Sequence, residues 1–340
     1  MIEKFDREIL YQHHQLSHDQ IDDLLGENRR SEFPGAKAQH LPKLAEFNAL
    51  ISLFIEEGIE FIPFKGPILS YLLYKDPLYR NYQDLDFFIK AESLSKAYEL
   101  LLQRGYSSPY FSWPESEQKQ QRLFKYTNQA ALIHPAGELS VEFHWQPFKS
   151  NVLRQQSIQE LLWNNTRTID FGGQTIKLLN REFELLYLII HGGLHRWERL
   201  KWLVDIKDYL VKVGYEQSVF SGYVKELKAG RMVALCNAML KEFFPDIEPL
   251  SCTTKVSPWL LKKNNESINR KEEQPYDDSF KGLTVGMIYL MRCFPGLSYK
   301  WNVLKTFNFT YDQLDRKGLL AHPLFHNLYR LIKKLIRRFS

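Results

Sequence analysis

Three acidic residues and a lysine–glycine pair are the groups in this 340-residue chain whose types and spacing could do chemistry. Asp84 and Asp86 alternate with apolar residues, and Glu142 lies between Val141 and Phe143 in a later apolar stretch. Side chains two apart on a strand point to the same side, so Asp84 and Asp86 are predicted to share one face. Carboxylates converging on a sheet edge can hold two divalent metal ions, which activate an attacking oxygen and stabilise a leaving oxygen.

The lysine–glycine pair lies between a predicted strand and a predicted helix. Gly66 follows the apolar segment 59–64 and begins a helical pattern that reaches Tyr74. A glycine at a helix N-terminus lets a phosphate approach backbone N–H groups, and the helix dipole favours its negative charge. Lys65 either contacts such a phosphate or ends in solvent. The alternating acids also have a simpler explanation, since solvated sheet faces commonly carry them without any function.

Hydrophobic periodicity supplies the elements that must position these residues. Strands are predicted over 59–64 and 83–89, and a hairpin over 124–134 and 138–145. After Pro147 helices dominate, with one small hairpin over 167–179 and a long solvated loop over 262–279. The fold class is therefore α/β (α+β), with a mixed sheet and a mainly helical C-terminal domain. We expect an N-terminal helical extension over residues 1–40, a catalytic core over 41–150 and the helical domain over 151–340. Helices are predicted over 42–57, 66–74, 93–103, 154–165, 181–191, 197–213, 216–227, 231–244 and 280–293.

Composition narrows the class of protein. Hydrophobic residues make up 44% of the chain, charged residues 25%, and the formal net charge is +5, which suits a soluble protein with a phosphate-bearing substrate without requiring one. The three cysteines are far apart and lack CxxC spacing, which argues against a disulfide framework or a thiolate metal site. The N-terminus lacks an apolar signal core, and no run approaches about 18 apolar residues. A cytoplasmic location is expected.

Three segments together carry a resemblance to a known family. FKGPILSYLLYKDPLYRNYQDLDFFI, LSVEFHW and LIIHGGLHRWERLKWLVDI resemble the uncharacterised nucleotidyltransferase family of the DNA polymerase beta-like superfamily, over roughly residues 41–210. The resemblance implies a polymerase beta-like mixed sheet, with Gly66 at the glycine turn and Asp84, Asp86 and Glu142 as metal-binding acids. It also implies a nucleoside triphosphate and two Mg²⁺ ions. The chain departs from the superfamily at Pro67, where a serine commonly follows the glycine.

Two further groups match positions of the same family. Arg80, four residues before Asp84, is predicted to contact phosphate or to pair with Asp76 or Asp84. His195 and Arg199 lie near one helical face with His191 and Trp202, where they would form a wall of the nucleotide site or a polar contact with Asp205. A zinc site is the weaker alternative, because the sequence is HGGLH and lacks the glutamate of HExxH. His144 shares the face of Glu142 and would orient that carboxylate or the acceptor, or serve structure alone.

The last residues, 323–340, predict a basic amphipathic helix. Such a helix docks on its own domain, or binds an anionic membrane surface or a partner protein. No RNP-like or zinc-finger pattern is present, so sequence-specific nucleic-acid binding is not expected.

The function indicated is metal-dependent transfer of a nucleoside monophosphate from a nucleoside triphosphate to an unknown acceptor, with release of pyrophosphate. Asp84, Asp86 and Glu142 would act as catalytic and metal-binding residues. Lys65, Gly66, Arg80, His195 and Arg199 would bind the nucleotide. Two alternatives remain open: a degenerate nucleotide-binding module without transfer, supported by Pro67, and an interaction protein that acts through residues 323–340.

Overall fold

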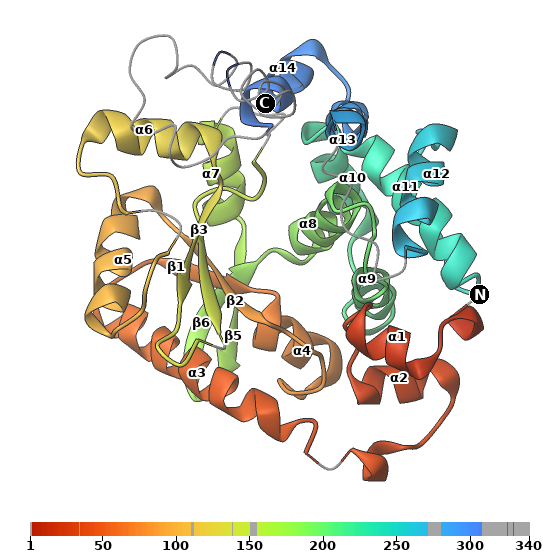
Figure 1. The fold of residues 1–340 in the computed structure, drawn as a ribbon, viewed down its shortest axis with the longest axis horizontal. Helices are drawn as coiled ribbons and strands as arrows, with labels where there is room; N and C mark the ends of the chain where they lie inside the picture. Colours follow the sequence, from red (N-terminus) through yellow and green to blue (C-terminus); the bar gives the residue numbers. More distant parts are fainter. Residues whose placement is uncertain are drawn as a thin grey trace, which may run out of the picture.

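A computed structural model describes residues 2–33, 35–109, 112–137, 139–149, 155–270 and 280–307, together with Phe325 and Tyr329. The predicted basic C-terminal helix therefore lies outside the described residues, apart from Phe325 and Tyr329. Figure 1 shows a sheet with its covering helices beside a second, entirely helical group. Among the described helices, none combines the length and the apolar character that crossing a membrane requires.

The sheet that carries the acidic residues is small and mixed. Its four strands lie in the order β1-β2-β4-β3. The pair β2–β4 is parallel, whereas β1–β2 and β3–β4 are antiparallel. The mixed α/β fold class is thus confirmed. A separate hairpin, β5–β6, lies beside β1. The strands are β1 Phe61–Phe64, β2 Asp84–Ile89, β3 Gln129–Ile133, β4 Ser140–His144, β5 Thr166–Phe171 and β6 Gln174–Leu179.

Alternation along the strands divides the sheet into two faces with different partners. On one face, Leu85, Phe87 and Phe143 pack in a core with Phe47 and Phe54 of the long helix below the sheet in Figure 1. The Phe54 and Phe87 rings meet edge to face at 5.3 Å. The opposite face carries the acids and turns toward the helical group. The helices over the first face are α3 Leu41–Glu56, α5 Leu94–Gln103 and α6 Glu117–Tyr126.

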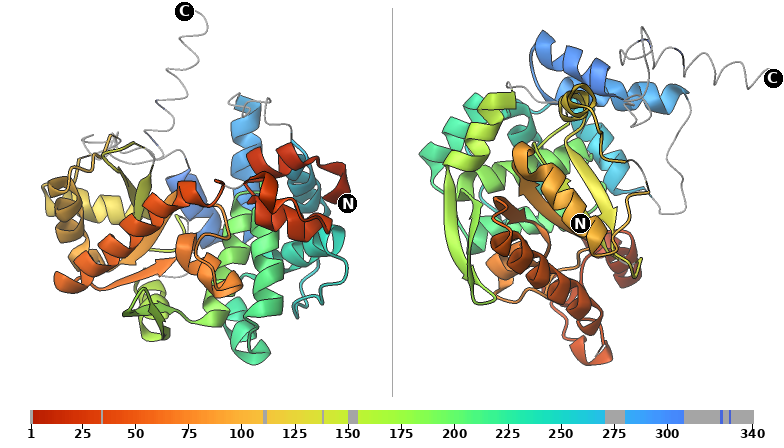
Figure 2. Two further views of the ribbon diagram at one scale, coloured as in Figure 1. Left: turned by 90° about the horizontal axis from the view of Figure 1, so that it is seen from below. Right: turned by 90° about the vertical axis from the view of Figure 1, so that its left-hand side faces the viewer.

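The helical group has a core of its own around α8, which is buried along most of its length. Leu10 and Ile21 from the two N-terminal helices and Leu16 from the turn between them belong to this core, as do Ile62, Phe64 and Phe88 from the sheet. Both Figure 1 and Figure 2 place these N-terminal helices against the helical group. The remaining helices are α1 Arg7–Gln12, α2 His18–Leu25, α4 Gly66–Tyr74, α7 Gln155–Asn164, α8 Arg181–Leu194, α9 Lys201–Lys212, α10 Gln217–Glu226, α11 Gly230–Phe243, α12 Pro258–Ile268, α13 Phe280–Cys293 and α14 Leu297–Thr306.

Two sequence predictions fail locally. The loop expected over 262–279 is helical up to Ile268, because Ser257 caps α12 and Leu260 and Ile268 are buried on one face. The rest of that prediction, residues 271–279, lies outside the described residues. Asn264, which looks polar and solvated in sequence, is also buried and bonds to the Tyr289 hydroxyl at 3.0 Å. The strand expected from residue 124 begins only at Gln129, since residues 117–126 form α6. Helix α14 was likewise not predicted.

Candidate functional site

Strand register brings the predicted acids together. Asp86 of β2 lies directly opposite Glu142 of the parallel strand β4, and Asp84 lies opposite Ser140. His144 follows Glu142 on the same face, opposite Phe88. Ligand atoms of Asp86, Glu142 and His144 all lie within 4.8 Å of one another. The strand alternation read from the sequence therefore produces a compact acid–histidine cluster at the centre of the sheet.

Asp86 is the buried member of this cluster. The sequence allowed a solvated sheet face, but the residue is only 1% exposed. Its Oδ1 atom lies 3.0 Å from His144 Nε2 and 3.5 Å from Lys65 Nζ. Its Oδ2 atom is buried and has no hydrogen-bond partner among the described residues. An unsatisfied buried carboxylate oxygen is energetically costly, so a cation bound at Asp86 Oδ2 would be stabilising.

His144 links the two carboxylates. Its Nε2 atom lies 3.3 Å from Glu142 Oε2, in addition to the contact with Asp86. Burial disfavours its charge, but hydrogen bonds to Asp86 and Glu142 outweigh this and raise the pKa of His144. Gln129 of β3 also donates to Glu142 Oε2, at 2.6 Å. Glu142 is thus fixed in orientation from two sides.

These residues fit a divalent cation by the chemistry of their donor atoms. Two carboxylates supply the hard oxygen ligands that Mg²⁺ and Mn²⁺ take, and the imidazole nitrogen of His144 also suits transition metals. The orphaned Oδ2 of Asp86 is the atom that such an ion would satisfy. Asp84 lies one alternation along the same strand face and lines the adjoining cavity.

The turn at Lys65 and Gly66 has an unusual backbone. Lys65 has φ 56° and ψ −144°, which is rare for a residue with a side chain, and Gly66 has φ 41°. A Cβ atom on Gly66 would lie 3.4 Å from the Asp84 carbonyl oxygen. Such strained conformations often occur at functional sites. Here the turn brings α4 close to β2, and it is Lys65, not Gly66, that lines the cavity.

The ammonium of Lys65 lies between acids and aromatic rings. It is near Asp86 and 5.4 Å from the centre of the Tyr187 ring. Burial disfavours its charge, but the Asp86 carboxylate outweighs this and raises the pKa of Lys65 above its usual value. Lys65 therefore remains charged beside the acidic cluster.

Arg80 has a different partner from those considered in the sequence. Its Nε and Nη2 atoms donate to the two carboxylate oxygens of Asp205 at 2.7 and 2.8 Å. Both side chains are buried, with exposures of 4% and 2%. The pair joins the loop before β2 to α9. Asp205 therefore pairs with Arg80. Within the part of the chain that the structure describes, no hydrogen bond or ion pair joins Asp205 to Arg199 or His195.

A cavity of about 790 Å³ opens between the acidic sheet face and the helical group. Its acidic side includes Asp84 and Glu142, and its opposite side is formed by α8 and α9. Residues from α13, α14 and the segment after β4 complete it. The polar and aromatic residues that line this cavity include Gln15, Lys65, Arg80, Asp84, Gln129, Glu142, His144, Lys149, Tyr187, His191, His195, Arg199, Lys201 and Trp202.

The end of α8 and the start of α9 present the predicted His–Arg group to this cavity. The rings of His191 and His195 lie 4.6 Å apart, and both pack near Trp202. Loss of hydration, followed by the charge of Lys65, lowers the pKa of His195 to about 4. The pKa of His191 is also lowered, mainly by burial. Both histidines are therefore neutral near pH 7, and Arg199 supplies the charge.

Close packing at two glycines fixes this segment. A Cβ atom on Gly192 would lie 2.4 Å from the Trp197 ring, and one on Gly193 would lie 2.3 Å from a Met232 carbon. The HGG sequence therefore lets α8 lie against a buried tryptophan and α11. This packing, rather than metal binding, accounts for the glycines between His191 and His195.

Other cavity residues were not singled out in the sequence. Lys149 and Lys201 each have a pKa lowered by burial, to about 8 and about 7 respectively. Gln129 and Tyr187 lie beside Glu142 and Lys65. Gln15 reaches the cavity from the turn between the two N-terminal helices. The only sequence signal for Lys201 was its place in the HRWERLKW segment, two residues after Arg199.

Comparison with known proteins supplies an independent finding. The model of a family described as uncharacterised nucleotidyltransferase matches residues 9–245. Among solved structures, the crystal structure of an antigenic nucleotidyltransferase-like protein from Paracoccidioides brasiliensis is similar, at 18% sequence identity. That match covers 59% of this chain and 88% of the other, with a TM-score of 0.34. None of the curated proteins matches the sequence.

Proposed function

We propose that this chain, which belongs to the uncharacterised nucleotidyltransferase family, transfers a nucleoside monophosphate from a nucleoside triphosphate to an acceptor hydroxyl in a metal-dependent reaction. The observation that carries the proposal is the orphaned Oδ2 of Asp86, which lies in register with Glu142 beside a cavity with cations on its other wall. In such a site a divalent-ion site adjoins a surface that can bind a polyphosphate.

Asp86 and Glu142, with Asp84 beside them, would hold two Mg²⁺ ions. When bound, such ions activate the attacking oxygen and neutralise charge on the leaving oxygen. His144 holds Asp86 and Glu142 in a common orientation through the contacts of its Nε2 atom. Preorientation of this kind lowers the reorganisation needed when the charges of the reaction develop.

The transfer is a single displacement at the α-phosphorus of the nucleoside triphosphate. The acceptor oxygen forms a bond to the α-phosphorus, and the bond from that phosphorus to the oxygen bridging to the β-phosphate breaks. Pyrophosphate leaves with the electron pair of that bond. Glu142 takes the proton of the acceptor hydroxyl on its carboxylate, which Gln129 and His144 keep oriented.

The phosphate-binding role falls mainly on the wall opposite the acids. Arg199 has no ion-pair partner within the described ranges and lines the cavity, so its guanidinium is available to phosphate oxygens. Neutral His195 can donate a hydrogen bond, and Lys65 adds charge beside Asp86. Gly66 contributes through the backbone turn that places Lys65. Arg80 acts through its pair with Asp205, which holds α9 against the loop before β2.

A second candidate function is nucleotide binding without transfer. It is favoured by the contacts of Asp86 Oδ1, since the Lys65 ammonium and the His144 imidazole already lie beside that oxygen. Pro67, at the second position of α4, also replaces the superfamily's serine and removes one backbone N–H donor. A role of residues 323–340 in membrane or partner binding falls outside the described part of the chain.

The test is to incubate the protein with each labelled nucleoside triphosphate, Mg²⁺ or Mn²⁺ and a cell extract. The molecule that carries the label afterwards is then identified. Asp86→Asn keeps the shape of the side chain and removes the metal-binding charge, so it should abolish transfer. Glu92→Gln changes an exposed acid away from the cavity and serves as the matched control. Nucleotide that binds in the presence of metal and is recovered unchanged, with no label on any acceptor, would favour the binding module. Transfer by Asp86→Asn at the wild-type rate would refute the proposed site.

A further inference from the structure

The turn between the two N-terminal helices contacts both walls of the cavity. Helix α1 ends at Gln12 and α2 begins at His18, and Ser17 caps α2 in a reciprocal capping box with Gln20. The residues between them, 13–17, are far in sequence from the sheet and from α8 and α9. Four successive residues of this turn nevertheless hydrogen-bond to the elements that border the cavity.

The first two of the four bind the start of α9. His14 Nδ1 accepts a hydrogen bond from the backbone N–H of Leu200 at 3.2 Å. Burial, with nearby positive charges, lowers the pKa of His14 to about 3, so its ring is neutral and can accept. The side-chain oxygen of Gln15 accepts from the Lys201 ammonium at 2.6 Å.

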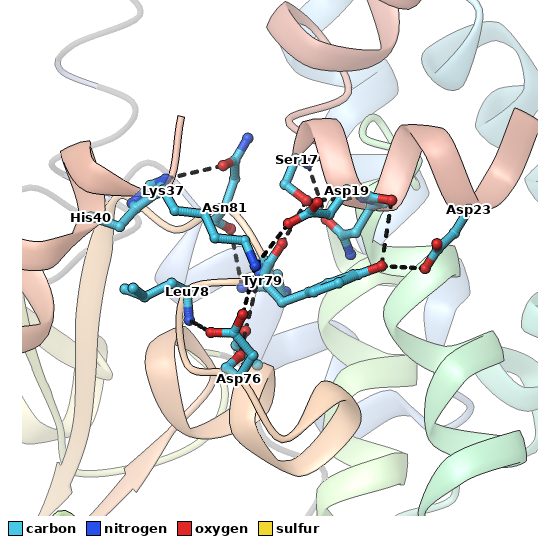
Figure 3. Close-up of polar contacts among 12 residues, drawn as sticks. Ser17, Asp19, Asp23, Lys37, His40, Asp76, Leu78, Tyr79 and Asn81 are labelled. Atoms are coloured by element: carbon cyan, nitrogen blue, oxygen red, sulfur yellow. Dashed lines mark hydrogen bonds and ion pairs between the residues drawn. The ribbon is translucent and has the colours of Figure 1, made fainter. Parts of the chain in front are cut away.

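The other two bind the loop before β2. The carbonyl oxygen of Leu16 accepts from the Asn81 amide at 3.0 Å, and the Ser17 hydroxyl donates to the Tyr79 carbonyl at 2.5 Å. Figure 3 shows Ser17, Tyr79 and Asn81 in this arrangement, beside Lys37, which pairs with both Asp19 and Asp76. The turn therefore connects the segment leading to Asp84 with the helix that carries Lys201.

Lys201 differs from Lys65 and Arg80 in its environment. Lys65 lies beside Asp86, and Arg80 is paired with Asp205. Lys201 has no acid within ion-pairing distance in the described part of the chain, and its bonded partner is the neutral Gln15. The other groups that act on its charge are Arg80, Asp84, Asp205 and Arg199. Burial lowers the pKa of Lys201 to about 7, and an anion bound beside it would favour the protonated form. An ammonium without a carboxylate partner that lines a cavity is a site for an anion.

We propose that Lys201 binds the polyphosphate of the substrate and that Gln15 is a positioning residue, which holds the ammonium toward the cavity. The inference rests on the proposed function and extends the nucleotide site to the N-terminal helices. Gln15 suits this role because its backbone has φ 55°, a left-handed conformation that is unfavourable for most side chains. A partner that is neutral orients Lys201 without neutralising the charge that phosphate would meet.

The experiment measures binding of each nucleoside triphosphate, and of inorganic triphosphate, to the full chain by calorimetry with Mg²⁺ present. Lys201→Met keeps a stem of similar length and removes the charge, and should weaken binding by about tenfold or more, or about 1.4 kcal/mol. Lys201→Arg should retain most of the affinity. Lys225→Met, on the exposed side of α10, is the control and should bind as wild type does.

Gln15→Gly tests the positioning role without disturbing the backbone, since glycine adopts positive φ readily. It should weaken binding roughly two- to tenfold in the wild-type background, and have no further effect in Lys201→Met. A purely structural role predicts instead that the two losses add and that unfolding free energy falls in step. Wild-type protein that binds no triphosphate would overturn the proposed function and this inference together. Triphosphate binding that Lys201→Met leaves unchanged would overturn this inference alone.

Discussion

Replacing Arg80 should destabilise the protein far more than replacing an exposed arginine. Arg80→Met would leave the Asp205 carboxylate buried, with 2% exposure, and without its two hydrogen bonds of 2.7 and 2.8 Å. Hydrogen bonds to charged groups contribute about 1.5–3 kcal/mol each. Removing one member of a buried pair costs about 3–5 kcal/mol, because the other charge remains unpaired. We therefore expect the free energy of unfolding to fall by roughly 3–5 kcal/mol.

Urea denaturation of the wild type, the two single variants, the double variant and a control variant measures this effect. Asp205→Leu should cost about as much as Arg80→Met, whereas the double variant should recover most of the loss, because no charge is left buried alone. Arg104→Met is the control, since Arg104 is 43% exposed and lies 3.8 Å from Glu46, and it should cost at most about 1 kcal/mol. A loss below about 1 kcal/mol for Arg80→Met, or additive losses in the double variant, would refute the reasoning. Arg80 would then be better explained as a phosphate ligand.

Three further outcomes are expected. Asp86→Asn should lose metal binding as well as transfer, which titration of the unligated protein with Mn²⁺ would detect; unchanged Mn²⁺ affinity would contradict the assignment. Arg199→Ala should weaken triphosphate binding by roughly 1.5–3 kcal/mol with little change in unfolding free energy, because Arg199 has no ion-pair partner in the described ranges; a stability loss at constant affinity would assign it to structure. The stability of the unligated protein relative to Lys201→Met should rise between about pH 7 and pH 10. In that window Lys201 is protonated in the unfolded chain, where its pKa is the ordinary 10.5, but has lost its proton in the folded protein, where its pKa is about 7. A difference in stability between wild type and Lys201→Met that does not change with pH would contradict the lowered pKa.

The alternation of residues along the strand was sufficient to predict which face of the sheet the aspartates share. Alternation in the segment 84–89 placed Asp84 and Asp86 on one face, and the boundaries of α4 and α13 agree with the sequence predictions. Local periodicity determines which side of a strand a residue occupies, because the period is two. It does not determine what covers that side, and so the sequence did not predict the near-complete burial of Asp86, whose hydrogen-bond partner His144 lies 58 positions away.

Pairing partners were the least predictable part of the site. The sequence suggested Asp76 or Asp84 for Arg80, since both are within four residues of it, whereas the observed partner is 125 residues away. A sequence without related sequences holds no information on such distant pairs. The helix over 258–268 was missed for a related reason: Asn264 is polar, and it is satisfied inside the core by hydrogen bonds to the Leu260 carbonyl and the Tyr289 hydroxyl.

The position of the N-terminal turn has a consequence for how the site forms. Its contacts with Leu200 and Lys201 span 186 positions, and those with Tyr79 and Asn81 span 62 and 65. Closing such long loops is entropically costly and slow, so these contacts are expected to form late, after the sheet and α8 have packed. Because the turn contacts Lys201, loss of that turn would affect the phosphate side of the cavity before it affected the acids, whose alignment depends on the register of β2 and β4. Metal binding and triphosphate binding are therefore separable properties of this chain, and changes in the turn should alter the second while the first persists.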